Sequence, residues 1–161
     1  MRNYRVKSSK IHTKMALNNK VIITTPILWL GFVLSISFME AWLKFQVEGV
    51  TLIIGMSIGK LIFFALNKVE IFFMVILSIS LFKKHWTLRK KNLVNLLICL
   101  MIILLIQTFY LLPALNQRVD MITNGNPPAA SYVHFYYLFL EVLKVIVLIF
   151  FSQLTFTKSN G

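Results

Sequence analysis

Cysteine and recognisable catalytic motifs are almost absent from this sequence. Cys99 is the only cysteine among 161 residues, which excludes an intrachain disulfide and a thiolate metal cage. It lies inside an apolar run, as is typical of a small packing residue. The three histidines, His12, His85 and His134, match no zinc or haem spacing. Because no nucleophile–base pair, phosphate-binding loop or dinucleotide fingerprint is present either, the sequence indicates no cofactor, no metal and no catalytic residue.

Acidic residues are also scarce: five stand against 17 basic residues, which makes the formal net charge +12. Charged residues form 14% of the chain and hydrophobic residues 58%, whereas soluble domains average roughly 25% and 45–50%. A basic excess of this size suits either nucleic acid or anionic lipid. The basic residues flank apolar runs and do not form a separate soluble module. We therefore expect anionic lipids at the basic segments and no nucleic acid.

Long apolar runs make up most of the remaining sequence. A helix needs roughly 20 predominantly apolar residues to cross a bilayer. The tail 1–20 is basic and has too few apolar residues to fold alone. The run after it has no small-residue cleavage site, which favours a retained membrane anchor. The sequence thus predicts an all-α, four-helix membrane bundle as a single domain over residues 21–158. Its spans are expected at about 21–39, 66–82, 93–112 and 136–156.

The segment 50–65, between the first two predicted spans, is harder to interpret. It is apolar but contains Lys60, and its length is marginal for a crossing. We expect a short extra helix here, interfacial or re-entrant, on the outer side of the membrane. Gly55 and Gly59 within it fit the small-xxx-small pattern of close helix packing. Further along the chain, Pro113 is expected to end the third span and to begin a polar loop.

The distribution of positive charge predicts an orientation. The tail holds six basic residues, the segment 83–91 holds five, and Lys158 follows the last span, with no acid among them. Short segments rich in Lys and Arg remain in the cytoplasm. Four crossings place all three segments on one side, whereas a fifth crossing at 50–65 would put segment 83–91 outside. We therefore expect a protein of the inner (cytoplasmic) membrane with both termini in the cytoplasm.

The other charged residues gather mostly in the outer half of the predicted bundle. A charge within hydrocarbon costs roughly 2.5–3.5 kcal/mol on insertion scales, so it usually faces a partner or water. Glu40 and Lys44 are spaced i, i+4, and Glu141 and Lys144 are spaced i, i+3, so each pair can interact along its helix. We predict a polar pocket of mixed charge that opens outward between the helices. Its candidate ligand-binding residues are Glu40, Lys44, Lys60, Glu70, His134, Glu141 and Lys144.

Each of these residues also has a structural interpretation. Arg118 and the lysines near span ends can extend to lipid headgroups, and the two Glu–Lys pairs can serve only to fix helix register. His134 lies among tyrosines, as in an interfacial aromatic belt; alternatively it senses protons beside Glu141, which is seven residues on and shares its helix face. Serines within spans, such as Ser37 and Ser78, can bond their own backbone.

Two stretches resemble known proteins. The first combines residues 35–45 (SISFMEAWLKF) with residues 55–67 (GMSIGKLIFFALN), and the second runs from Leu112 through His134 to Lys144. Together they resemble uncharacterised small bacterial four-span membrane proteins. More distantly they are similar to the transmembrane-protein-205-like family, in which a comparable loop carries a histidine into the last helix. The resemblance implies a four-helix membrane bundle and no established activity.

Three functions are compatible with these features. The first is a non-enzymatic membrane protein whose pocket serves transport or sensing of a small ligand. The second is a structural or assembly subunit, whose intramembrane charges pair with a second copy or with another membrane protein. An intramembrane enzyme is the least favoured, because no catalytic set is recognisable. If Glu141 and Lys144 line an open cavity, the ligand hypothesis gains; if they face lipid, a partner must cover them.

Overall fold

The computed structural model describes the backbone of residues 2–82, 88–126 and 128–156, and every regular element within these ranges is helical. Four stretches are long and apolar enough to cross a membrane, namely Leu17–Gln46, Leu52–Phe82, Lys91–Thr123 and Val133–Phe156. The predicted all-helical class with four such helices is therefore confirmed. The elements are α1 (Arg2–Val33), η1 (Leu34–Glu40), α2 (Ala41–Leu43), η2 (Lys44–Gln46), α3 (Leu52–Phe82), α4 (Leu88–Ile106), η3 (Gln107–Leu111), α5 (Leu112–Thr123) and α6 (Val133–Phe156).

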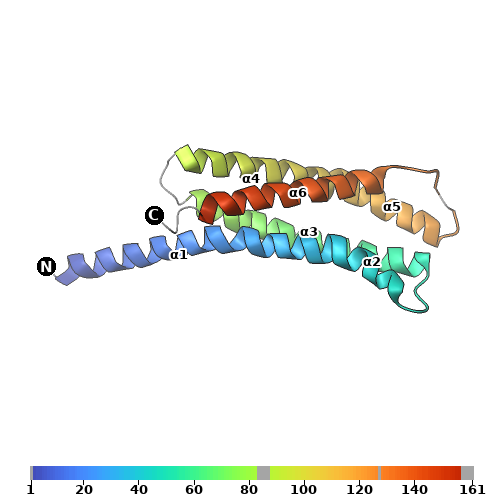
Figure 1. Ribbon diagram of the computed structural model, residues 1–161, viewed down its shortest axis with the longest axis horizontal. Helices are drawn as coiled ribbons and strands as arrows, with labels where there is room; N and C mark the ends of the chain where they lie inside the picture. The colour runs from blue at the N-terminus through green and yellow to red at the C-terminus, as the bar shows by residue number, and fades with distance from the viewer. Residues whose placement is uncertain (1, 83–87, 127, 157–161) are drawn as a thin grey trace.

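The four long stretches lie lengthwise beside one another (Figure 1). Helix α1 packs against α3 and α6, and α4 packs against the same two helices. The beginning of α1 and the end of α6 lie toward one end of the bundle, with α1 projecting beyond its neighbours, whereas α2 and α5 lie at the opposite end. We call this opposite end the α2–α5 end.

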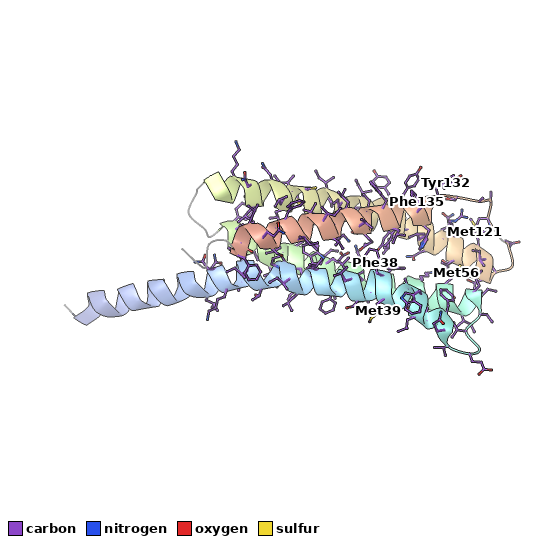
Figure 2. All side chains as sticks on the ribbon, viewed as in Figure 1. Phe38, Met39, Met56, Met121, Tyr132 and Phe135 are labelled. Carbon is purple, nitrogen blue, oxygen red and sulfur yellow. The ribbon has the colours of Figure 1, made fainter. Side chains whose placement is uncertain are left out.

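Apolar side chains fill the bundle and also cover its outside. Trp29 stacks on Phe73 in the interior with ring centroids 6.2 Å apart, and Leu148 and Phe151 are fully buried beside them. On the outside, large apolar side chains such as Phe135 are exposed along all four stretches (Figure 2). An apolar exterior this extensive is unfavourable in water and is typical of helices in contact with lipid.

The segment expected to form a separate helix at 50–65 is instead the first half of α3, which continues unbroken for 31 residues. The expectation of an extra interfacial or re-entrant element is thus corrected. The glycines allow close packing here and do not break the helix. A Cβ at Gly55 would lie 2.1 Å from Cε1 of Phe45, and one at Gly59 would lie 2.8 Å from Nζ of Lys44. The packing role expected for this glycine pair is confirmed.

Pro113 does not end the third span. The chain passes from α4 through the π-helical turn η3 into α5, and Pro113 occupies the first turn of α5. A proline lacks the N–H that a helix interior requires, but the π-helical turn has already rearranged the backbone hydrogen bonds just ahead of it. The predicted polar loop therefore begins only after Thr123.

The N-terminal tail also differs from expectation, because α1 begins at Arg2 and includes nearly all of the basic segment 1–20. A helix that is anchored by packing further along can extend through residues that could not nucleate one. Lys and Arg have high helix propensity, which favours such an extension. Of the basic segment 83–91, residues 83–87 lie outside the described residues.

Two turns close the connections at the α2–α5 end. Gly49 takes φ +86° between η2 and α3, where other residues would be strained. The hydroxyl of Thr51 then accepts a hydrogen bond from the amide of Ile54 at 3.3 Å and caps α3. Gly125, at φ +78°, follows α5, and the hydroxyl of Ser131 accepts from the amide of Val133 at the start of α6. Short connections of this kind make neighbouring helices antiparallel.

Candidate functional site

A buried ionic cluster lies in the middle of the bundle. Lys144 of α6 lies with Nζ 2.5 Å from Oε1 of Glu70 on α3 and 2.9 Å from Oε1 of Glu141, one turn earlier on α6. The side chains of all three residues are at most 1% exposed. The predicted Glu141–Lys144 pair is therefore confirmed. Glu70, 74 positions before Lys144, is the partner that the local spacing could not reveal.

Three neutral side chains complete this cluster. The indole N–H of Trp29 donates to Oε1 of Glu70 at 3.1 Å. The hydroxyl of Ser37 donates to Oε2 of Glu141 at 3.0 Å, and the amide of Gln107 donates to Oε1 of Glu141 at 2.8 Å. We use the term ionic cluster for Trp29, Ser37, Glu70, Gln107, Glu141 and Lys144. Each long stretch of the bundle thus contributes at least one residue to it.

Two π-helical turns place polar side chains on Glu141. Ser37 belongs to η1, and Gln107 opens η3. A π-helical turn contains one extra residue, so it changes the direction in which side chains point, and such turns recur at functional sites. In this protein both of them contribute a buried hydrogen-bond donor to the same carboxylate.

The ionic cluster is not balanced in charge or in hydrogen bonds. Two carboxylates face one ammonium group, which leaves one negative charge in excess when all three groups are ionised. Two buried oxygens, Oε2 of Glu70 and Oε1 of Gln107, have no hydrogen-bond partner among the described residues. Buried acceptors are seldom left without a donor. Across the described side chains, no three His, Cys, Asp or Glu residues gather as they would around a metal ion.

A second polar site lies at the α2–α5 end. It is a cavity of about 450 Å³ between α2, η2, α3, α5 and the start of α6, and we call it the end pocket. Its walls are mostly apolar, with Phe45, Met56 and Phe63 among them. Three cations also line it, Lys44, Lys60 and Arg118, together with His134, Asn116 and Ser131, and no acidic side chain is among its lining residues.

Two acidic residues beside the end pocket form ion pairs with two of its cations. Lys60 lies 2.5 Å from Asp120 of α5, and Lys44 lies 3.4 Å from Glu40 one turn before it. The predicted Glu40–Lys44 pair is thus confirmed. Arg118 donates to the carbonyl of Ala129 at 2.8 Å. These contacts orient the three cations, and the two acids do not cancel the three positive charges, so positive charge remains in excess at the end pocket.

An aromatic pair connects the two sites. Phe63, which lines the end pocket, packs edge-on against Tyr137 with ring centroids 5.2 Å apart. Tyr137 is itself buried, and its hydroxyl interacts with Glu141 of the ionic cluster. The rings of Phe63 and Tyr137 therefore lie between the end pocket and the ionic cluster.

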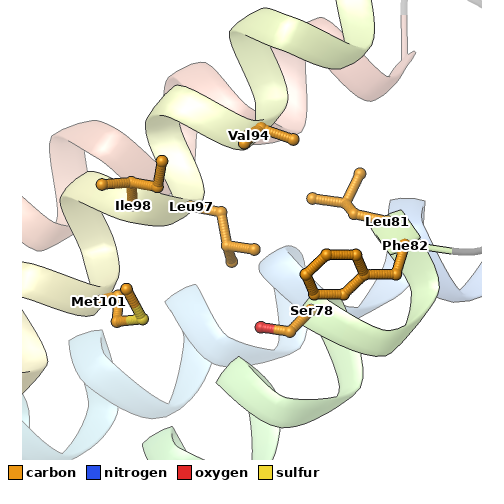
Figure 3. A pocket seen from close by; sticks show the side chains of 7 residues that line it. All are labelled: Ser78, Leu81, Phe82, Val94, Leu97, Ile98 and Met101. Carbon is orange, nitrogen blue, oxygen red and sulfur yellow. The ribbon is translucent and has the colours of Figure 1, made fainter. Parts of the chain in front are cut away.

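A separate apolar cavity lies between α3 and α4, away from the ionic cluster and the end pocket. Figure 3 shows its lining, with Leu81 and Phe82 from α3 and Leu97 and Met101 from α4, and its volume is about 270 Å³. Ser78 is its polar lining residue, and its hydroxyl donates to the carbonyl of Met74 in its own helix, as expected for a serine in a span. This apolar groove offers no group that would orient a polar ligand.

The seven candidate residues therefore divide between two places. Glu70, Glu141 and Lys144 meet in the ionic cluster and line none of the described cavities, whereas Lys44, Lys60 and His134 line the end pocket and Glu40 pairs with Lys44 beside it. His134 shares a helix face with Glu141 but lies on an exposed turn, while Glu141 is fully buried.

Sequence reasoning missed three members of the ionic cluster. Trp29 and Ser37 have no distinguishing local pattern, and Ser37 bonds Glu141 rather than its own backbone. Gln107 did carry a signal, because an amide side chain is costly within a long apolar run and therefore needs a partner.

Comparison of the chain with protein-family models, with curated proteins and with solved structures finds no match.

Proposed function

We propose that this chain is an integral protein of the inner membrane, with cytoplasmic termini, that binds a small amphiphilic anion in the end pocket for transport or sensing. The charge distribution supports this orientation, since the basic beginning of α1 lies toward the end of the bundle away from the end pocket. Anionic lipid headgroups are the proposed partners of those segments.

One observation carries the ligand proposal: the lining of the end pocket combines three cations, no acid and a mostly apolar wall. A volume of about 450 Å³ falls within the range of small-molecule sites. Guanidinium and ammonium groups bind phosphate and carboxylate oxygens, and the apolar wall would accommodate a short hydrocarbon portion. A molecule with one anionic group and a small apolar part matches both features.

The alternative of a structural or assembly subunit rested on intramembrane charges that need a partner. Lys144 is paired with both Glu70 and Glu141 inside one chain, and the three side chains are buried. They need no second protein to cover them, which removes the main support for the subunit proposal. They also line none of the described cavities, so the ligand proposal rests on the end pocket and not on these residues.

Butyl phosphate is a suitable probe because it is small, anionic and partly apolar. We expect isothermal titration of the protein in lipid nanodiscs to show saturable binding of butyl phosphate and none of butanol. Lys60→Met should weaken binding by about tenfold or more, since a charge-assisted hydrogen bond contributes roughly 1.5–3 kcal/mol.

The matched control is Lys68→Met, on the same helix. Lys68 is exposed, lies over the ring of Phe64 and does not line the end pocket. The Lys68→Met variant should bind butyl phosphate with the same affinity as the unmodified protein. Equal loss in both variants, or no saturable binding to the unmodified protein, would contradict the ligand proposal.

A further inference from the structure

Oε2 of Glu70 is an unusual atom, because it belongs to a buried carboxyl group and has no donor among the described residues. The other oxygen of the same carboxyl, Oε1, takes two donors, the indole of Trp29 and the ammonium of Lys144. A carboxylate distributes its charge equally over both oxygens and attracts donors to each. A carboxylic acid instead has one accepting carbonyl oxygen and one hydroxyl oxygen that bears its own hydrogen.

Among the described residues, no further charged group faces the ionic cluster to balance its charge. From α1 and η1 the neutral Trp29 and Ser37 face the carboxylates, and from η3 the neutral Gln107. From α6 come Lys144, Glu141 and the hydroxyl of Tyr137. The cluster therefore carries a net charge of −1 unless it binds one positive charge, and an uncompensated buried charge costs several kcal/mol.

We propose that the ionic cluster is a proton-binding site that holds one proton on Oε2 of Glu70. The proton makes the cluster neutral, because ionised Glu141 and Lys144 then cancel. It also accounts for the lack of a donor to Oε2, because a hydroxyl oxygen carries its own hydrogen. Glu141 keeps its charge because Ser37, Gln107 and Lys144 all donate to it. The site is separate from the end pocket and does not depend on ligand binding there.

Charge balance makes the number of protons testable by infrared spectroscopy near neutral pH, with the protein in a detergent that contains no ester or carboxyl group. A buried carboxylic acid gives a carbonyl stretching band that a carboxylate lacks. We expect this band in the unmodified protein. Glu70→Gln should abolish it, since Glu141 and Lys144 alone are neutral. Lys144→Met should about double it, since two buried carboxyls without a cation both bind protons.

The frequency of the carbonyl band identifies the residue that holds the proton, because this frequency depends on the hydrogen-bond donors to that carbonyl group. Trp29→Phe removes a donor to the carbonyl oxygen of Glu70 and should raise the frequency of the band. The matched variant Ser37→Ala removes a donor to Glu141 and should leave the band unchanged.

Three results would overturn the proposal. Absence of the band in the unmodified protein means that both carboxylates are ionised and that the ionic cluster holds no proton. A band that persists in Glu70→Gln belongs to another carboxyl group. A shift in Ser37→Ala with none in Trp29→Phe assigns the proton to Glu141. Trp29→Phe and Ser37→Ala retain all three charged residues, so the test does not depend on the folding of the Lys144 variant.

Discussion

At the scale of single residues, Lys144 is the cation that joins two buried carboxylates. Its ammonium group lies between two carboxylates from different helices and is fully buried. A buried ion pair is a weak source of net stability compared with apolar packing, but the removal of one partner is costly. The main effect of removing Lys144 would therefore be to leave two buried carboxyl groups without a cation.

Lys144→Met should lower the free energy of unfolding by about 3 kcal/mol, within the range measured when one member of a buried pair is removed. The thermal unfolding of the detergent-solubilised protein measures this change. Glu70→Gln should cost much less, because an amide replaces a group that is already neutral in the proposed state. Equal loss of stability in the two variants would contradict the neutral-acid assignment of Glu70.

Gly55 allows η2 to pack against α3. Gly55→Ala places a methyl group 2.1 Å from the ring of Phe45 and should destabilise the α2–α5 end by about 1–3 kcal/mol through overpacking. Gly31→Ala, also in a helix interior, meets nothing within 4 Å and should be neutral or stabilising by up to about 1 kcal/mol. Similar melting temperatures for both variants would show that the close approach of Phe45 is not required.

At the scale of elements, each π-helical turn sets how far the segment after it is rotated about the helix axis relative to the segment before it. Because η3 lies between α4 and α5, it allows Gln107 to face Glu141 while Asp120 of α5 faces Lys60 of α3. A regular α-helix advances about 100° per residue. The insertion or removal of one residue would therefore turn one of these side chains away from its partner.

Deletion of Phe109, an exposed residue within η3, should turn α5 relative to α3 and separate positions 60 and 120. A protein with Lys60→Cys and Asp120→Cys, in a Cys99→Ala background, should form an intramolecular product with a short bismaleimide crosslinker. Mass spectrometry should detect this product with Phe109→Ala but not with the deletion. Efficient crosslinking after the deletion would show that the π-helical turn does not set the register.

At the scale of the whole molecule, charge predicts how the bundle sits in the membrane. Glu48, exposed in the turn between η2 and α3, lies at the α2–α5 end, and Thr87 belongs to the basic segment 83–91 of the sequence. In intact cells carrying a Cys99→Ala background, Glu48→Cys should react with an impermeant maleimide and Thr87→Cys should react only after lysis. The reverse pattern would invert the proposed orientation.

The helical spans could be predicted because they depend on local sequence. A run of apolar residues long enough to cross hydrocarbon determines a helix whatever it packs against. The pairs Glu40–Lys44 and Glu141–Lys144 were accessible for the same reason, because one turn of helix brings each pair together. The local sequence was misleading at Pro113, which was expected to end a span, and at residues 50–65, which were expected to form a separate helix. In both places the helix continues within the packed bundle.

Which charges meet across the bundle was decided by tertiary structure alone. Nothing in the sequence around Glu70 points to Lys144, 74 residues away, or to Trp29. Their contact depends on how four helices pack and on two π-helical turns that redirect Ser37 and Gln107. The four long apolar helices and the uneven distribution of positive charge follow from the sequence alone. Packing divided most of the remaining charges between the end pocket and the buried ionic cluster, because buried charges must find partners wherever the fold supplies them.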